Sequence, residues 1–282
     1  MIRFVKIEVR FRKGVPPRNE FLGSALRGAF GAALKRTVCV NPKYQCESAN
    51  GDLGCKYAAN CLYDEFFIRK NIYHAYRFSK PIGENNYDFS LYIFESACEK
   101  LPYILNALKE MASAYGFERD REKPEIDKII CNDRVVYEND EFNLSAVEPR
   151  NFEPPNLRDK ITLRFQTPLR MKSDNKLLVS KPALRQILFS ILDRVNKLKG
   201  LPTIKLPFEP LYKEGESAVA FKDYARFSAR QQTKMQLGGI MGYIRYETID
   251  AKSYTLLKLG EITGVGKQTV FGLGEIKVED NG

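Results

Sequence analysis

The sequence predicts an α+β fold made of two tandem ferredoxin-like units, each with an antiparallel sheet that carries helices on one face. Three observations lead to this. Apolar residues alternate at the start of both halves, each opening strand is followed by a segment with helical periodicity, and the proline-rich segment EPRNFEPPN (148–156) separates the halves. We therefore expect an amino-terminal domain over 1–150 and a carboxyl-terminal domain over 157–282.

The amino-terminal half follows the order β-α-β-β-α-β. From Val5 to Phe11 the odd positions are apolar and Lys6, Glu8 and Arg10 are charged, which is typical of a strand with one buried face. A helix is expected from about Asn19, acting as its cap, to Arg36. Next come strands near 72–79 and 87–95, a helix over about 99–115, and a hairpin of Ile126–Cys131 and Asp133–Tyr137. This order is a split βαβ pattern.

The carboxyl-terminal half repeats the order. Ile161, Leu163 and Phe165 alternate with polar residues and predict a second opening strand. A helix is expected from Pro182 to Lys199, strands near 217–232 and 240–248, a helical or extended piece near 252–259, and a final strand at 271–278. Since no residue-level repeat is evident, the duplication is inferred from the element order.

The charge of the chain favours a polyanionic partner. Lys and Arg total 45 against 35 acidic residues, a net charge of +10 with the single His neutral. Cations that neutralise phosphates release condensed counterions, although a Lys-rich surface also serves solubility and ion pairing. The 15 Tyr and 18 Phe include potential stacking faces for unpaired bases. No apolar run approaches the roughly 20 residues of a membrane span, and the first strand lacks the apolar core of a signal peptide, so we expect a cytoplasmic protein.

Four of the six cysteines lie within a 23-residue segment of the inserted loop at about 37–63: Cys39, Cys46, Cys55 and Cys61. Their spacing is C-x6-C-x8-C-x5-C, and four thiolates can close a tetrahedral structural zinc site in a loop that has no core of its own. The alternative is a set of unpaired thiols. A catalytic zinc is disfavoured because four sulfurs leave no open position. Cys98 and Cys131 lie in apolar surroundings and are expected to be buried thiols.

The most informative segment is GEITGVGKQTVFGLGEIKV at 260–278. Its glycines follow the pattern G-x-G-x5-G-x-G, formed by Gly264, Gly266, Gly272 and Gly274, with Lys267 inside. Paired glycines can take positive φ, and exposed N–H groups in such a loop form an anion-binding concavity. Two tight turns that flank a strand are the simpler alternative. A dinucleotide-binding loop is less probable, since that loop follows the first strand and opens a helix.

At these residues the chain resembles the repeat-associated (RAMP) proteins of CRISPR systems, and within them the endoribonuclease that processes precursor CRISPR RNA. The glycine loop is similar to that family's G-x-G-K-x-T-x-F-G-x-G signature. Three further segments resemble the family's first helix, the strand that opens its second half, and its R-x-S-x-R-Q stretch with the following Gly-Gly turn: LGSALRGAFGAAL (22–34), ITLRFQTPLRMK (161–172) and YARFSARQQTKMQLGGIMGYIRY (224–246).

The resemblance implies two RAMP domains that bind CRISPR repeat RNA and cleave precursor crRNA within the repeat. It implies metal-independent attack by the 2′-hydroxyl, no catalytic cofactor, and 2′,3′-cyclic phosphate and 5′-hydroxyl ends. A second interpretation is a catalytically inactive RAMP subunit that holds crRNA with other CRISPR-associated subunits in an effector complex. A basic metabolic enzyme with a phosphate loop has little support, because no acid–base or cofactor constellation accompanies the glycines.

Candidate catalytic residues must move protons between the 2′-hydroxyl and the leaving 5′-oxygen. His74 is the single histidine, and an imidazole exchanges protons near neutral pH. The resemblance implies a histidine near the end of the first helix, but LKRTVCVNPKYQ (34–45) contains none. The nearest substitutes there are Lys35, Arg36, Lys43 and Tyr44, of which Arg36, Lys43 and Tyr44 are the catalytic candidates. The expected RNA-binding residues are Gly264, Gly266, Lys267, Gly272, Gly274, Arg226, Arg230 and Gln231, the last three on one strand edge.

Overall fold

The computed structural model describes residues 2–281 except 13–20, 42–45, 47–54, 56, 71, 80–86, 118–122, 145–146, 174 and 229–232, with backbone alone at 115, 225–228 and 233–236. The described chain divides into two compact units. One contains Arg3–Tyr76 and Lys80–Asn151, and the other contains Met1–Ile2, Arg77–Ser79 and Phe152–Gly282. The proline-rich segment predicted to separate two domains thus lies where the second unit's main stretch begins.

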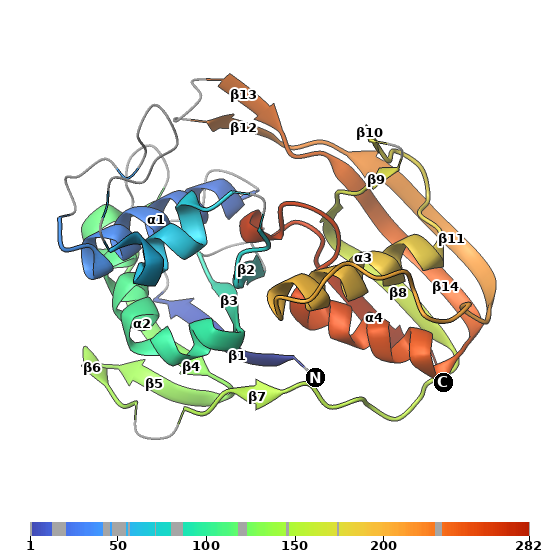
Figure 1. Ribbon diagram of the computed structural model, residues 1–282, viewed down its shortest axis with the longest axis horizontal. Helices are drawn as coiled ribbons and strands as arrows, with labels where there is room; N and C mark the ends of the chain where they lie inside the picture. Colours follow the sequence, from blue (N-terminus) through green and yellow to red (C-terminus); the bar gives the residue numbers. More distant parts are fainter. Residues whose placement is uncertain are drawn as a thin grey trace. The chain divides into compact units, whose positions relative to one another are not determined.

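The sheet of the amino-terminal unit has the strand order β2-β3-β1-β4-β5-β6, with β7 also paired to β1 (Figure 1). The order β4-β1-β3-β2 is that of a ferredoxin-like unit, and the pairs recorded for β1 with β3 and β4 are antiparallel. The strand bounds are β1 Arg3–Phe11, β2 Tyr76–Ser79, β3 Phe89–Phe94, β4 Ile126–Cys131, β5 Arg134–Glu138, β6 Glu141–Phe142 and β7 Arg150–Asn151. The predicted alternation of the first strand is confirmed, because Val5, Ile7 and Val9 are almost fully buried.

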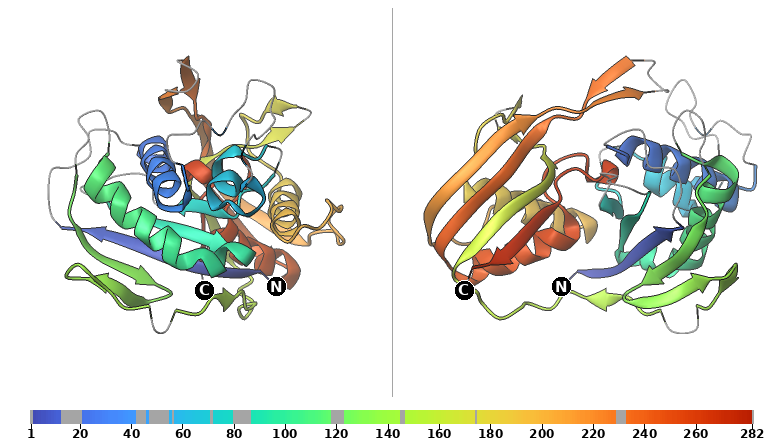
Figure 2. Two further views of the ribbon diagram at one scale, coloured as in Figure 1. Left: turned by 60° about the vertical axis from the view of Figure 1, so that its left-hand side comes forward. Right: turned by 180° about the vertical axis from the view of Figure 1, so that it is seen from behind.

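Two helices, α1 (Gly23–Val38) and α2 (Leu101–Glu110), cover one face of this sheet (Figures 1 and 2). The helix α1 begins at Gly23, after Leu22, and not at Asn19, which lies outside the described residues. The helical turns η3 (Glu95–Lys100) and η4 (Met111–Tyr115) extend α2 at its two ends. Two more, η1 (Ala58–Asn60) and η2 (Asp64–Ile68), lie within and directly after the cysteine segment. The described part of the chain contains no helix long and apolar enough to cross a bilayer.

The sheet of the carboxyl-terminal unit repeats this topology with the order β11-β14-β8-β15. Two helices lie side by side on one of its faces (Figure 1). Gly260 sits where they meet the sheet, since a Cβ there would lie 2.6 Å from Ile191 and 2.9 Å from Ile276. The bounds are β8 Ile161–Leu169, α3 Leu184–Leu198, β11 Tyr212–Lys222, β14 Gly239–Ile249, α4 Ala251–Thr263 and β15 Ile276–Asp280. The predicted α+β class with two ferredoxin-like units is confirmed.

Two details of the carboxyl-terminal half differ from the sequence-based expectation. The strand expected over 217–232 ends at Lys222, and the chain continues into a ribbon of β12 (Ala225–Ser228) and β13 (Thr233–Gln236). The final strand begins at Ile276 rather than 271, because a short 3-10 turn, η5 (Thr269–Phe271), precedes it. A small ribbon of β9 (Lys172–Ser173) and β10 (Lys176–Leu177) follows β8.

Asp250 caps the amino terminus of α4. Its carboxylate accepts hydrogen bonds from the amides of Lys252 and Ser253, both at 3.0 Å, and of Leu211 at 2.9 Å, and from the Ser253 hydroxyl at 2.6 Å. Burial opposes the charged form, but these hydrogen bonds outweigh it and lower the pKa of Asp250. A lowered pKa stabilises the fold above the unfolded-state pKa, and that contribution is lost as the pH falls through the folded-state value.

Replacing Asp250 with Ala is therefore expected to lower the free energy of unfolding by about 1–2 kcal/mol at pH 7, the usual cost of a lost amino-terminal cap. The difference between the two proteins should shrink steadily below pH 4, where the wild-type carboxylate becomes protonated. Urea unfolding at several pH values measures it. A difference that stays constant down to pH 2 would contradict the assigned role of the carboxylate charge.

Candidate functional site

The glycine-rich loop joins α4 to β15, and several of its residues have backbone φ angles in the left-handed region. The φ angles of Gly264, Gly266, Gly272 and Gly274 are 74°, 76°, 80° and 69°. Gln268, between the two glycine pairs, also has a positive φ of 63°. Side chains with a Cβ rarely adopt such angles, so the spacing seen in the sequence is a backbone requirement of this loop.

The amide groups of these glycines are used inside the protein. The amides of Gly264 and Gly272 donate to nearby carbonyls, those of Gly260 and Thr269, both at 2.8 Å. The amide of Gly266 donates to the Ser190 hydroxyl at 2.9 Å, and the amide of Gly274 donates to the Pro168 carbonyl at 3.0 Å. All four glycines are buried. The expectation that these amides are exposed and available to a phosphate is therefore wrong. Each amide already donates to an acceptor inside the protein, and breaking such a hydrogen bond would leave a buried donor unsatisfied.

Close packing is a second reason for glycine at these positions. A Cβ on Gly274 would lie 1.7 Å from the carbonyl oxygen of Val265, and one on Gly266 would lie 2.4 Å from the carbonyl oxygen of Arg170. The loop closes on itself through a hydrogen bond of 2.9 Å from the Val265 amide to the Gly274 carbonyl. The glycines thus build a tightly folded loop, and any contact with a ligand must come from other atoms of it.

Lys267 is the cationic side chain that the loop presents to solvent. Its side chain is exposed, while its amide is held by the Arg170 carbonyl at 2.8 Å. Within the described residues, no ion pair involves its ammonium group. An exposed lysine with no carboxylate partner among the described residues suits contact with a phosphate.

The other expected RNA contacts lie on the β12–β13 ribbon. Arg226 is in β12, where it pairs with Met235 of β13, and the structure describes its backbone only. Arg230 and Gln231 lie outside the described residues. The structure therefore brings Gly264, Gly266, Lys267, Gly272 and Gly274 together in one loop, and the assignment of all eight residues to RNA binding stays a prediction.

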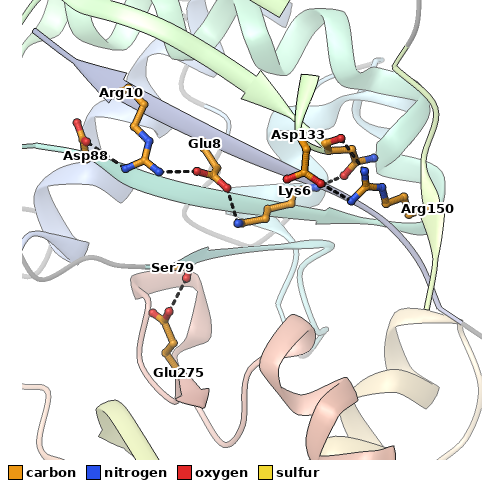
Figure 3. Close-up of polar contacts among 9 residues, drawn as sticks. Lys6, Glu8, Arg10, Ser79, Asp88, Asp133, Arg150 and Glu275 are labelled. Atoms are coloured by element: carbon orange, nitrogen blue, oxygen red, sulfur yellow. Dashed lines mark hydrogen bonds and ion pairs between the residues drawn. The ribbon is translucent and has the colours of Figure 1, made fainter. Parts of the chain in front are cut away.

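Sequence reasoning missed two residues that bind this loop, Arg77 and Ser79. Arg77 donates from Nε to the Ile262 carbonyl at 2.6 Å and from Nη2 to the Glu261 carbonyl at 2.5 Å. The Ser79 hydroxyl donates to the Glu275 carboxylate at 2.7 Å (Figure 3). No spacing rule connects positions more than 180 residues apart, so only the folded chain reveals these contacts.

His74 precedes β2 and is half-buried. Its Nδ1 lies 2.9 Å from the carbonyl oxygen of Glu65, an acceptor that requires a proton on Nδ1. In the neutral ring the lone pair is then on Nε2, which is the arrangement a general base needs. Of the other catalytic candidates, Arg36 is exposed in the last turn of α1, and Lys43 and Tyr44 lie outside the described residues.

A charged row lies on β1 of the amino-terminal unit (Figure 3). Glu8 is bonded to Lys6 and, at 2.7 Å, to Arg10, which also contacts Asp88 at 3.2 Å. Burial disfavours the charge of Glu8, yet the two cations outweigh it and lower the pKa of its carboxyl group. Because carboxylates accompany both cations, this row is a balanced ion-pair network and offers little unpaired positive charge.

The four clustered cysteines are half-buried and carry free thiols. Burial raises the pKa of Cys46, Lys35 lowers it, and the nearby Cys39, Cys61 and Cys55 raise it further. The other three thiols thus each lie within electrostatic reach of Cys46. Among the described residues, however, no three His, Cys, Asp or Glu side chains are placed to hold a metal ion. Zinc binding would need the thiolates to draw closer, and the structural zinc stays a prediction. Cys98 and Cys131 are buried, as expected.

If these cysteines hold zinc, the purified full-length chain is expected to carry about one zinc ion. Replacing Cys46 or Cys55 with Ser should remove the metal and make the segment at 37–63 more sensitive to protease. Metal content by mass spectrometry with limited proteolysis checks both effects. Cys98→Ser is the control, because this cysteine lies outside the cluster and should leave the zinc content unchanged. A metal-free wild-type chain purified without chelator would contradict the prediction.

Two family models match the chain. The model for the CRISPR-associated endoribonuclease Cas6 matches residues 163–276, which run from β8 into β15 and include the glycine loop. A model for an N-terminal domain, AF_1859_N, matches residues 2–151. The N-terminal model ends at residue 151, directly before the stretch Phe152–Gly282 of the second compact unit.

Other comparisons cover nearly the whole chain. An uncharacterized protein of Archaeoglobus fulgidus is 25% identical over 288 residues, covering 94% of this chain and 92% of that protein. A Cas6 product complex from Thermus thermophilus has a TM-score of 0.57 at 16% identity, with 99% of both chains covered. A second Cas6 product complex has a TM-score of 0.54 at 15% identity, with 99% of this chain and all of that chain covered. At these identities the solved structures bear on the fold alone, and they agree with two ferredoxin-like units in tandem.

Proposed function

This chain belongs to the CRISPR-associated, RNA-processing RAMP-type proteins, and from that premise we propose that it binds CRISPR repeat RNA and cleaves precursor crRNA within the repeat. The observation that carries the proposal is the Cas6 match over 163–276, the stretch that holds the glycine loop and Lys267. The net charge of +10 supports a polyanionic ligand.

The chemistry that we propose uses no metal. The 2′-oxygen attacks the adjacent phosphorus, its proton passes to a general base, and the bond from phosphorus to the 5′-oxygen breaks. A proton donor neutralises the leaving 5′-oxygen. The products are a 2′,3′-cyclic phosphate and a 5′-hydroxyl, so atoms and charges balance without a co-reactant. Cations beside the phosphate stabilise the charge of the transition state.

For the general base we propose His74. It is the only histidine, and its Nδ1 faces the Glu65 carbonyl, so Nε2 can accept the proton. Arg36, Lys43 and Tyr44, at and after the end of α1, are the candidates for charge stabilisation and proton donation. Lys267 is proposed to hold the RNA backbone, with Arg226, Arg230 and Gln231 as further contacts.

One observation favours a second function. Residues 34–45, where the resemblance implies a catalytic histidine, contain none. A chain without an effective base would bind crRNA and leave it intact, as a RAMP subunit beside other CRISPR-associated proteins does. The two functions share the RNA contacts and differ only in the chemical step.

Incubating the protein with end-labelled repeat RNA in EDTA separates the two functions. A discrete product that ends in a 2′,3′-cyclic phosphate is expected, together with its loss in His74→Ala and in RNA carrying a single 2′-deoxy sugar at the cut. RNA bound but uncut would support the subunit role. Failure to bind repeat RNA in preference to a scrambled RNA of equal length would overturn both.

A further inference from the structure

Arg77 is one of the most buried side chains of the protein, with 1% of its surface exposed. A guanidinium group is rarely buried unless hydrogen bonds satisfy it. Here Nε and Nη2 donate to the carbonyls of Ile262 and Glu261, and Nη1 lies 3.3 Å from the carbonyl of Phe78. The guanidinium group therefore donates to two consecutive backbone carbonyls of α4.

These two carbonyls belong to the last turn of α4, immediately before the glycine loop. The last carbonyls of a helix have no intrahelical partner, and the helix dipole makes this end negative. A buried cation at this point satisfies both the hydrogen-bonding and the electrostatic demand. The contact continues into the loop itself, since a Cβ on Gly264 would lie 3.1 Å from Cδ of Arg77.

The same strand segment also holds the other end of the loop. The Ser79 hydroxyl donates to the carboxylate of Glu275, the residue that follows Gly274 (Figure 3). Two hydrogen bonds with Thr167 and Gln166 of β8 fix Glu275 further: its amide donates to the Thr167 hydroxyl at 2.9 Å, and its carbonyl accepts from the Gln166 amide at 2.8 Å. Arg77–Ser79 also cluster with the carboxyl-terminal unit, although the residues around them belong to the other unit.

We propose that Arg77, assisted by Ser79, is a positioning residue that holds both ends of the glycine-rich loop and so fixes Lys267 for contact with an RNA phosphate. The proposal rests on the proposed function, because it assigns Arg77 a role in RNA binding through a residue that it does not touch. The glycines allow the left-handed backbone of the loop. Arg77 and Ser79 add hydrogen bonds to the residues at its two ends.

The first test measures the loop itself. Arg77→Lys keeps the charge but cannot span two carbonyls. In hydrogen exchange on the full-length protein, peptides over 260–278 are expected to exchange about tenfold faster than in the wild type. Peptides of α3 should remain unchanged. Ser79→Ala, a smaller change, should accelerate exchange around Glu275 only. Arg150→Lys is the matched control, because Arg150 also donates to a backbone carbonyl, that of Asn132 at 2.7 Å, in the other unit.

The second test links the loop to RNA by a double-mutant cycle. The Kd for repeat RNA is measured for the wild type, Arg77→Lys, Lys267→Ala and the double variant. If Arg77 acts through Lys267, Arg77→Lys should weaken binding about tenfold in the wild type and less than about twofold in Lys267→Ala. A purely structural effect would weaken binding equally in both backgrounds and would overturn the proposal.

The two tests separate the proposal from the proposed function. Unchanged exchange in the loop of Arg77→Lys overturns the positioning role, whether or not RNA binds. A wild-type protein that does not bind repeat RNA overturns the proposed function and the RNA role of Arg77 together, while the exchange result still decides whether Arg77 holds the loop.

Discussion

Gly274→Ala is expected to destabilise the carboxyl-terminal unit by about 4 kcal/mol, near the upper end of what single substitutions do. Two costs combine. A φ of 69° is strained for alanine, and the new Cβ would lie 1.7 Å from the carbonyl oxygen of Val265. The backbone must move to relieve that overlap, and the hydrogen bond from the Val265 amide to the Gly274 carbonyl would be lost.

Denaturant unfolding monitored by hydrogen exchange measures this effect in each unit separately. Because the chain contains two compact units, only the transition of residues 152–281 should move to lower denaturant. Gly28→Ala is the matched control. Gly28 lies within α1, and a Cβ there would meet nothing within 4 Å. That variant should be unchanged or more stable by up to about 1 kcal/mol. Equal stability of Gly274→Ala and wild type would contradict the loop geometry.

Lys267→Glu is expected to weaken binding of repeat RNA by at least about tenfold, with little change in stability. The substitution removes a phosphate contact and places a carboxylate where the polyanion approaches. Because fewer counterions are released, the slope of log Kd against log salt should also fall by about one unit. Fluorescence anisotropy with labelled repeat RNA at several salt concentrations gives both quantities.

Lys252→Glu makes the same change of net charge at another exposed position, in the first turn of α4. A carboxylate is well tolerated at the start of a helix, so this control should fold normally. Its effect on RNA affinity should be limited to the long-range change in net charge. If the two variants weaken binding equally, Lys267 makes no specific contact, and the glycine loop is not where the RNA backbone is held.

Periodicity identified much of this fold because it reflects local geometry. The alternation from Val5 to Phe11 predicted a strand with one buried face, and β1 has that face. The segment near 252–259 was ambiguous, because α4 buries residues on more than one stripe, as the burial of both Tyr254 and Leu259 shows. The last strand begins later than expected, since the positive φ of Gly272 and Gly274 interrupts extended backbone.

By itself, the sequence determined the class of each unit, the places where glycine is obligatory, and the presence of Lys267 among those glycines. Only the tertiary structure decided what Gly266 and Gly274 do, because Ser190 and Pro168, which accept from their amides, lie 76 and 106 positions away in the chain. The same holds for Arg77, whose position in the sequence shows no relation to α4. A positive φ angle is a local property that favours glycine, so it can be read from the sequence. A hydrogen-bond partner from a distant segment is fixed only when the chain folds.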